Sequence, residues 1–393
     1  MPFTAGDEFD YPVGGLEEFG DEDDDEEDFM HTGGEAGHSS TAAILFSSYL
    51  GFWSETMLNL PDSLYPDPIQ GDNSVMSNGG APVNNNGPCD GASKAIDWPS
   101  ASAEDLVVLL REPEHGEKAI SSLTQIKKQG RIQDLALHIW RSISTVFLLL
   151  SEVLSIYKSL TPEKLTMKDS SKVCDVLVLF ECLATHPQTK MQFLNVQIHC
   201  YLYPFLETEE TSKPFQYLRL MSLGVIGGLL KEVGDPSTKA AVHCLLESGL
   251  FPLCLKSIEY GNELSQSTAS WIMSRIMMQE QGLQYCCEPA NRLCAIMKVF
   301  NDVIEKMQDE PSTTVLKNII QCYVILSDDP SRGCLLLRSF IPPILTTAPY
   351  IEALRARPIT LKNLQDLFQK LSMGCGPNAE VVGDVAGSSH LDR

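Results

Sequence analysis

The sequence predicts an all-α protein, an armadillo/HEAT-like helical solenoid preceded by a disordered acidic arm. Apolar residues recur at helical spacing from about residue 103 onward, period-2 strand and hairpin patterns are not convincing, and a proline-led motif recurs. The predicted domains are a disordered acidic arm and linker over 1–102, an armadillo-like helical repeat domain over 103–372 and a flexible tail over 373–393.

The acidic charge of the chain is concentrated in the arm. Of the formal net charge of −23, residues 1–100 carry −19, because Lys94 is their only basic residue. The run 21–28 consists of Asp and Glu alone, which repel one another and favour an extended chain. The rest of the chain carries −4, so its charge indicates no broad surface for nucleic acid.

A short apolar segment over 42–53 interrupts the arm. It is too short to cross a bilayer, which needs about 20 apolar residues, so no membrane association is predicted. It is either a short helix that docks on a partner or on this protein's own body, or a segment that folds nowhere. Residues 61–97 are rich in Pro, Asn, Gly and Ser, which predicts a linker.

Helical periodicity begins near residue 103. In 117–127, Ala119, Ile120, Leu123 and Ile126 share one face. Residues 134–157 are apolar nearly all round, which predicts one long helix inside a helical layer. The predicted helices span 104–110, 117–127, 134–157, 172–184, 191–196, 200–206, 214–231, 239–247, 252–260, 264–279, 294–307, 312–326 and 361–371.

A proline motif indicates internal repeats. His186-Pro187 and Asp329-Pro330 are each followed by a pair of apolar residues, and then by an isoleucine eleven residues after the proline. Phe251-Pro252 matches the last element, ninety residues before Ile341-Pro342. Two repeats of about 45 residues fit this spacing, within the armadillo/HEAT range of roughly 40–47. Proline also suits the first helical position, where its missing N–H has no helical partner.

Glycines at 224, 227 and 228 lie at i, i+3 and i+4, although each costs a helix up to about 1 kcal/mol relative to Ala. Because glycine has no side chain, these three residues leave one face of the helix without side chains. Two interpretations remain open: close packing against a neighbouring helix, or contact with a bound peptide.

Motifs for catalysis are not found. The chain contains no H-E-x-x-H, no G-x-x-x-x-G-K-[ST] and no G-x-S-x-G. His199-Cys200 and His243-Cys244 place the two side chains on different sides of a helix, which does not supply a base to a thiol. We therefore predict a protein that is not an enzyme and has neither cofactor nor metal.

The cysteines and the first residues predict a location inside the cell. Most of the twelve cysteines lie in apolar, helix-like surroundings, and no secretory signal opens the chain. We therefore expect a cytoplasmic and nuclear protein without disulfides.

Residues 214–227, Pro-Phe-Gln-Tyr-Leu-Arg-Leu-Met-Ser-Leu-Gly-Val-Ile-Gly, closely resemble the hallmark helix of the "required for cell differentiation" family. Collinear matches follow at 134–142, 201–206, 251–255, 262–265 and 322–328, so the resemblance covers about 103–372. That family supplies the armadillo-repeat subunit of the CCR-NOT mRNA deadenylase complex. The resemblance implies a non-catalytic adaptor, present in P-bodies, that binds the Not scaffold subunit and short peptide motifs of RNA-regulatory proteins in mRNA decay and translational repression.

The resemblance also implies two kinds of site. A peptide groove is expected along the hallmark helix. Tryptophan-accepting pockets are expected to be weakened, because the family's Tyr, Arg and small Ala are here Ala290, Ser331 and Leu335, while Pro252 and Arg292 are kept. The expected groove residues are Tyr217, Leu220, Met221, Gly224 and Thr268, where Met221 and Thr268 replace the family's Thr and Val.

Two other functions remain open. A nucleic-acid-binding armadillo protein would need several of Lys127, Lys128, Arg131, Arg141, Arg219 and Arg275 on one surface. A diverged paralogue outside the complex would act as a transcriptional or developmental cofactor through its acidic arm. Weak nucleic-acid binding and a homodimer also remain open.

We expect residues 103–372 to fold alone, because the apolar periodicity lies there. Circular dichroism should show a helical protein that melts cooperatively, within a few degrees of the full chain. A larger loss on removal of residues 1–100 would mean that the arm is part of the fold.

Overall fold

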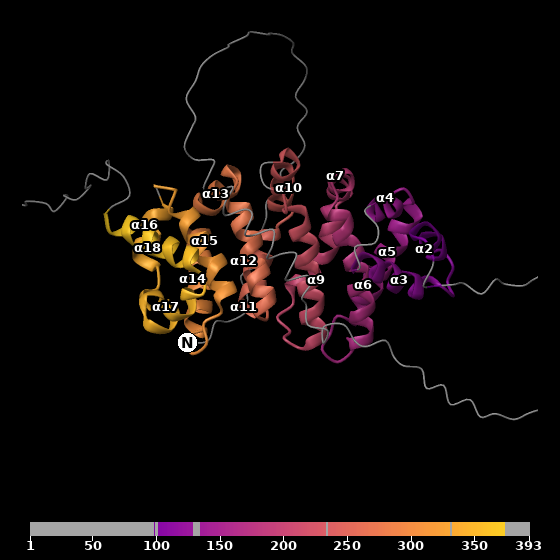
Figure 1. Ribbon diagram of the computed structural model, residues 1–393, viewed down its shortest axis with the longest axis horizontal. Helices are drawn as coiled ribbons and strands as arrows, with labels where there is room; N and C mark the ends of the chain where they lie inside the picture. The colour runs from indigo at the N-terminus through magenta and orange to yellow at the C-terminus, as the bar shows by residue number, and fades with distance from the viewer. Residues whose placement is uncertain (1–97, 99–100, 129–133, 233–234, 331, 374–393) are drawn as a thin grey trace, which may run out of the picture. The chain divides into compact units, whose positions relative to one another are not determined.

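The computed structural model describes residues 98, 101–128, 134–232, 235–330 and 332–373 (Figure 1). Every regular element in these ranges is an α-helix or a 3-10 helix, so the predicted all-α fold class is confirmed. The predicted arm over 1–102 lies almost wholly outside the described residues. The tail lies outside them after residue 373.

The elements repeat in sets of three. The third helix of each set packs against its equivalents in the sets before and after it, and Figure 1 shows these helices side by side in chain order. They are α3 (Gly116–Lys128), α6 (Met167–Thr185), α9 (Lys213–Leu229), α12 (Glu263–Met277), α15 (Thr313–Leu326) and α18 (Pro358–Met373).

Two other elements precede each of these helices from α6 onward, and α2 (Ala103–Leu109) precedes α3. The first elements are α4 (Leu135–Trp140), α7 (Pro187–Asn195), α10 (Pro236–Glu247), α13 (Glu280–Cys287) and α16 (Gly333–Phe340). The second elements are α5 (Ile143–Ser155) with η2 (Ile156–Ser159), η3 (Ile198–Leu202) with α8 (Tyr203–Glu207), α11 (Leu250–Tyr260), α14 (Ala290–Lys306), and η4 (Pro343–Thr346) with α17 (Ala348–Arg355).

Hydrogen bonds between consecutive sets reveal the repeat length. Gln216 donates to the carbonyl oxygen of Tyr260, 44 residues later, at 3.3 Å. Asn318 donates to the carbonyl oxygen of Ser267, 51 residues earlier, at 2.8 Å. The two separations, 44 and 51 residues, are close to the spacing of about 45 residues predicted from the proline motif, although the second exceeds the armadillo/HEAT range of roughly 40–47.

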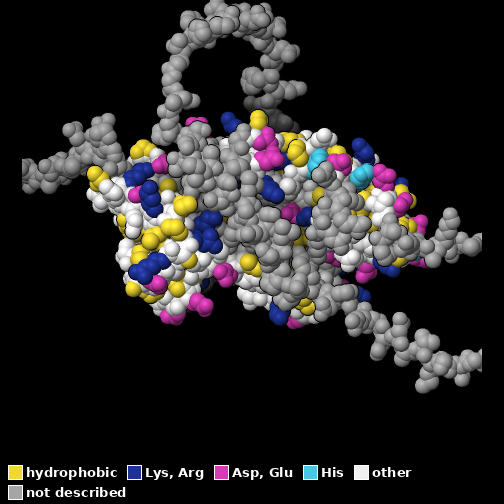
Figure 2. All heavy atoms as spheres, viewed as in Figure 1, with side chains coloured by type: hydrophobic (Ala, Val, Ile, Leu, Met, Phe, Trp, Pro, Cys, Tyr) yellow, Lys and Arg dark blue, Asp and Glu magenta, His cyan; other side chains and the backbone are white. Residues whose placement is uncertain are grey.

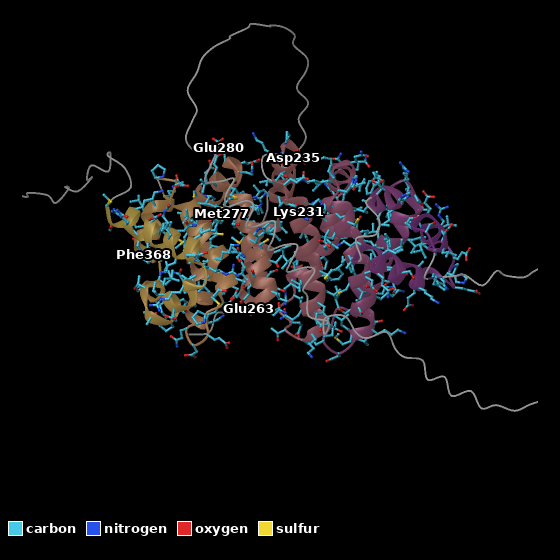
Figure 3. All side chains as sticks on the ribbon, viewed as in Figure 1. Lys231, Asp235, Glu263, Met277, Glu280 and Phe368 are labelled. Atoms are coloured by element: carbon cyan, nitrogen blue, oxygen red, sulfur yellow. The ribbon has the colours of Figure 1, made fainter. Side chains whose placement is uncertain are left out.

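Arg275 of α12 joins its helix to the end of α9. Its Nε and Nη2 donate to the carbonyl oxygen of Leu230 at 3.1 and 2.9 Å. The last carbonyls of a helix have no partner within the helix, so this guanidinium satisfies a group that would otherwise be buried unpaired. Figure 3 shows Lys231, just after α9, and Met277, at the end of α12, close to this junction.

The long apolar segment 134–157 differs from its prediction. It forms two helices, and the chain breaks at Arg141 and Ser142. Ser142 is the N-cap of α5, where its hydroxyl oxygen accepts from the backbone N–H of Thr145 at 3.3 Å. Serine at an N-cap satisfies a free backbone donor, which stabilises the break in a segment whose apolar pattern is continuous.

Proline starts helices at some positions only. Pro187 is at the start of α7, as predicted. Pro252 is not the first residue of α11, because that helix begins at Leu250 after Gly249, whose φ of 77° lies in the left-handed region. Proline is tolerated anywhere in the first helical turn, so the motif located the element but not its boundary.

Three other expectations need correction. The predicted helices do not include α13, α16 and α17, each of which is only eight residues long. The expected helix over 200–206 begins as the 3-10 helix η3. Cys334 is disulfide-bonded, although no disulfide was expected.

Within the described residues, no single helix is long and apolar enough to span a membrane. Only α10 and α11 together meet that length and composition, and they are bent by 80° at their junction.

Gly228 of α9 allows close approach to α6. A Cβ at this position would lie 2.8 Å from the hydroxyl oxygen of Thr185 and 3.4 Å from the Cβ of Ala184. The structure therefore favours helix packing as the reason for this glycine.

We expect Gly228→Ala to give no gain in stability in the natural background, although Ala is favoured over Gly in helices by about 1 kcal/mol. In a Thr185→Ala background the blocking oxygen is absent, so Gly228→Ala should stabilise by up to about 1 kcal/mol. Urea unfolding of the four proteins measures this coupling. Additive effects would show that Thr185 does not limit the approach.

Candidate protein-binding surfaces

The expected groove residues come together on two neighbouring helices. Tyr217, Leu220, Met221 and Gly224 belong to α9, and Thr268 belongs to α12, which packs against α9. Gly224 is buried and Tyr217 is half-buried. The exposed fractions of Leu220, Met221 and Thr268 are 3%, 7% and 7%. The structure thus places the five on two helices that are in contact, and their part in peptide binding stays a prediction.

The described tryptophan-pocket remnants lie on α11, α14 and α16. Contacts join α11 to α14 and α14 to α16. Pro252 and Ala290 are exposed, Arg292 is half-buried, and Leu335 is 50% exposed. Ser331 lies outside the described residues. The set is therefore on connected helices, with apolar side chains at its surface.

Arg292 already stacks on an aromatic ring of its own chain. Its guanidinium carbon lies 3.5 Å from the ring centroid of Tyr285, and its Nη1 donates to the carbonyl oxygen of Tyr285. Phe251 contacts the same ring edge-on, with 5.5 Å between centroids. One face of the cation is thus occupied, which is a physical reason to expect weaker stacking on an incoming indole.

An unexpected apolar surface lies on α5. Ile143, Phe147 and Leu154 are 84%, 68% and 39% exposed. They recur at spacings of four and seven residues, so they share one face, which we call the α5 face. Leu149 and Val153 are fully buried on the other side of the helix.

The sequence interpretation placed this helix inside a layer, and that was wrong for one of its faces. A helix that is apolar all round was assigned to the interior. The same pattern also fits an outer helix whose second apolar face contacts a partner. Isolated exposed apolar residues are normal, whereas an aligned set on one helix indicates an interaction surface.

The α5 face has a fixed position on the body. Contacts join α5 to α4, α6 and η3. The Tyr157 hydroxyl, just after α5, donates to the carbonyl oxygen of Tyr201 in η3, and Tyr201 is itself 38% exposed. The α5 face thus belongs to a firmly packed part of the fold.

Three of the basic residues required for nucleic-acid binding are buried or paired within the described part of the chain. Arg219 is fully buried, and its Nη2 donates to the carbonyl oxygens of Thr208 and Glu210 at 2.6 and 3.0 Å. Arg275 is buried at the α9–α12 junction, and Lys127 forms an ion pair with Glu181. Figure 2 shows Lys and Arg interspersed with Asp and Glu on the face in view.

A metal-binding cluster is also missing from the described part of the chain. No group of three or more His, Cys, Asp or Glu there is placed to hold a metal ion.

Comparison with known proteins gives a family match over most of the chain. Residues 106–371 match the family described as "Cell differentiation family, Rcd1-like". The "Cell differentiation protein rcd1" of Schizosaccharomyces pombe is 39% identical over 256 residues, 65% of this chain and 88% of the yeast protein. "Protein CAF40" of Saccharomyces cerevisiae is 38% identical over 230 residues, which are 58% of this chain and 60% of that protein.

Solved structures similar to this one include a designed armadillo repeat protein. It is 13% identical, with a TM-score of 0.47, and the match covers 69% of this chain and 100% of the designed one.

Gly224→Trp distinguishes the two interpretations of the glycine face. Because Gly224 is buried in α9, we expect the indole to overpack the core and lower the free energy of unfolding by roughly 1–3 kcal/mol. Gly224→Ala is the matched control. Thermal melting measures the difference. A Trp variant as stable as the natural protein would show that this face is open, and its peptide binding should then be titrated.

Proposed function

The chain belongs to the Rcd1-like cell differentiation family, and from that membership we propose that it is a non-catalytic adaptor subunit of the CCR-NOT deadenylase complex. Its proposed role is in mRNA decay and translational repression. We also propose that it acts in the cytoplasm, including P-bodies, and in the nucleus.

The α5 face carries the proposal of a scaffold-binding surface. Ile143 and Phe147 expose most of their side chains to water. Burying a side chain of this kind stabilises an association by about 1.5–3 kcal/mol. A row of apolar side chains on a helix is the pattern that contacts the apolar face of a partner helix. We therefore propose that the Not scaffold subunit binds here through an apolar helical face.

Short peptide motifs are proposed to bind at surfaces other than the α5 face. Supporting it are the convergence of the five groove residues on α9 and α12, and the exposed apolar side chains around Arg292. Because the tryptophan-pocket remnants carry a cation already stacked on Tyr285, we propose that tryptophan-containing peptides bind only weakly.

We expect Phe147→Asp to abolish co-purification with the Not scaffold, because it places a charge at the centre of an apolar interface. Ile143→Asp should act in the same direction. Each decade of lost affinity corresponds to about 1.4 kcal/mol, so we expect a loss of more than tenfold. The measurement is a pull-down of tagged full-length chain, followed by titration with the purified scaffold segment.

Ile359→Asp is the matched control, because Ile359 is 48% exposed on α18, at the far end of the helical array. It should bind the scaffold normally, and all variants should melt like the natural protein. Normal binding by Phe147→Asp would remove the α5 face from the proposal. If the natural chain itself does not bind the scaffold, the diverged-paralogue interpretation is favoured instead.

A further inference from the structure

One cluster at a junction between repeats is independent of the proposed function. His199 and Cys200 belong to η3, and Cys244 belongs to α10 of the next repeat. The His199 Nε2 lies 3.5 Å from the Cys200 sulfur and 3.9 Å from the Cys244 sulfur, so the expectation that His199 and Cys200 point to different sides of a helix is wrong. Two thiols from consecutive repeats therefore meet at one imidazole nitrogen.

The imidazole is neutral at physiological pH. His199 is fully buried, and burial lowers its pKa to about 4. A neutral imidazole has one N–H donor and one acceptor nitrogen. Thiols are weak donors, so Nε2 is the acceptor that both of them can share, with the proton on Nδ1. Among the described residues, Nδ1 has no hydrogen-bond partner.

Because both sulfurs lie near the same nitrogen atom, Nε2 of His199, they also lie near each other. Their separation cannot exceed the sum of the two sulfur–nitrogen distances. Both cysteines are free thiols and half-buried rather than sealed in the core. A small oxidant also has access.

We propose that Cys200 and Cys244 form an oxidisable thiol pair, which hydrogen peroxide converts into a disulfide across the junction between the α7–α9 and α10–α12 repeats. One cysteine loses its proton, and its sulfur attacks a peroxide oxygen, which gives a sulfenic acid and one water. The second sulfur attacks the sulfenic sulfur and releases a second water. Two electrons pass from the thiols to the peroxide, and one S–S bond replaces two S–H bonds.

The surroundings make this crosslink slow to form and durable. Burial raises the pKa of the Cys200 thiol, and the nearby Cys244 adds to that shift. Burial also raises the pKa of the Cys244 thiol, with a contribution from Glu247. Little thiolate is present at neutral pH, so oxidation is slow. A thiol of high pKa is also a poor leaving group, so reduction of the disulfide is slow as well.

The disulfide would link two repeats that are already joined at this junction by a hydrogen bond. The hydroxyl groups of Tyr203, at the start of α8, and Ser248, at the end of α10, lie 2.6 Å apart. A disulfide beside this bond restricts the unfolded chain, since it closes a loop between consecutive repeats. The oxidised protein should therefore be more stable than the reduced protein.

The test begins with reduced full-length protein, which is exposed to hydrogen peroxide, blocked with an alkylating reagent and digested without reductant. We expect mass spectrometry to find the Cys200 and Cys244 peptides joined, two hydrogens lighter than their sum. The melting temperature should rise by several degrees in the natural protein. It should not rise in Cys200→Ser or Cys244→Ser. Cys294→Ser is the matched control, because Cys294 is exposed and lies outside the cluster.

Several outcomes would overturn the proposal. One is oxidation of Cys294 with no peptide joining Cys200 to Cys244, and another is coupling of Cys200 to a different cysteine. Stoichiometric uptake of Zn²⁺ by the reduced protein, lost in either serine variant, would make the cluster a metal site instead. The peptide map of the natural protein needs no variant, so it decides the question even if a serine substitution disturbs folding.

Discussion

The burial of each long helix between its equivalents in the preceding and following repeats is the constraint on which the structure depends. α9 lies between α6 and α12 and is buried along nearly its whole length. A helix in that position needs neighbours on both sides, so no single repeat can bury its own core. The close approach at Gly228 and the bonds of Arg275 to Leu230 are consequences of this constraint, because each joins consecutive repeats.

The same stacking decides which surfaces remain for partners. Contacts between repeats cover the sides of the long helices. Exposed apolar side chains therefore lie mainly on the second element of a set and near the two ends of the helical array. The α5 face is one such surface, and the region around Arg292 is another. An array of this kind offers extended contact surface. Within its described residues it holds no cluster suited to a metal ion.

Buried polar groups set the register between repeats. Lys190 of α7 is 2% exposed and donates to the Thr238 hydroxyl of α10 at 3.0 Å. Asn318 of α15 donates to the Ser267 carbonyl of α12. An unpaired buried group costs about 1–3 kcal/mol, so a shifted register would lose these bonds at that cost. His199 differs, because its partners are thiols, which bond weakly and can react.

The sequence by itself determined the all-α class, the approximate repeat length and the family, because helical periodicity, proline placement and the 214–227 segment are local patterns. Only the tertiary structure decided which apolar side chains are buried and which are exposed. Segment 134–157 looks uniformly apolar, yet α5 buries Leu149 and exposes Phe147. The sequence suggests that Arg219 and Arg275 are surface cations. In the structure both are buried and donate hydrogen bonds to carbonyl oxygens of other segments. In each case the partner lies elsewhere in the chain, and burial depends on neighbours that a local pattern does not contain.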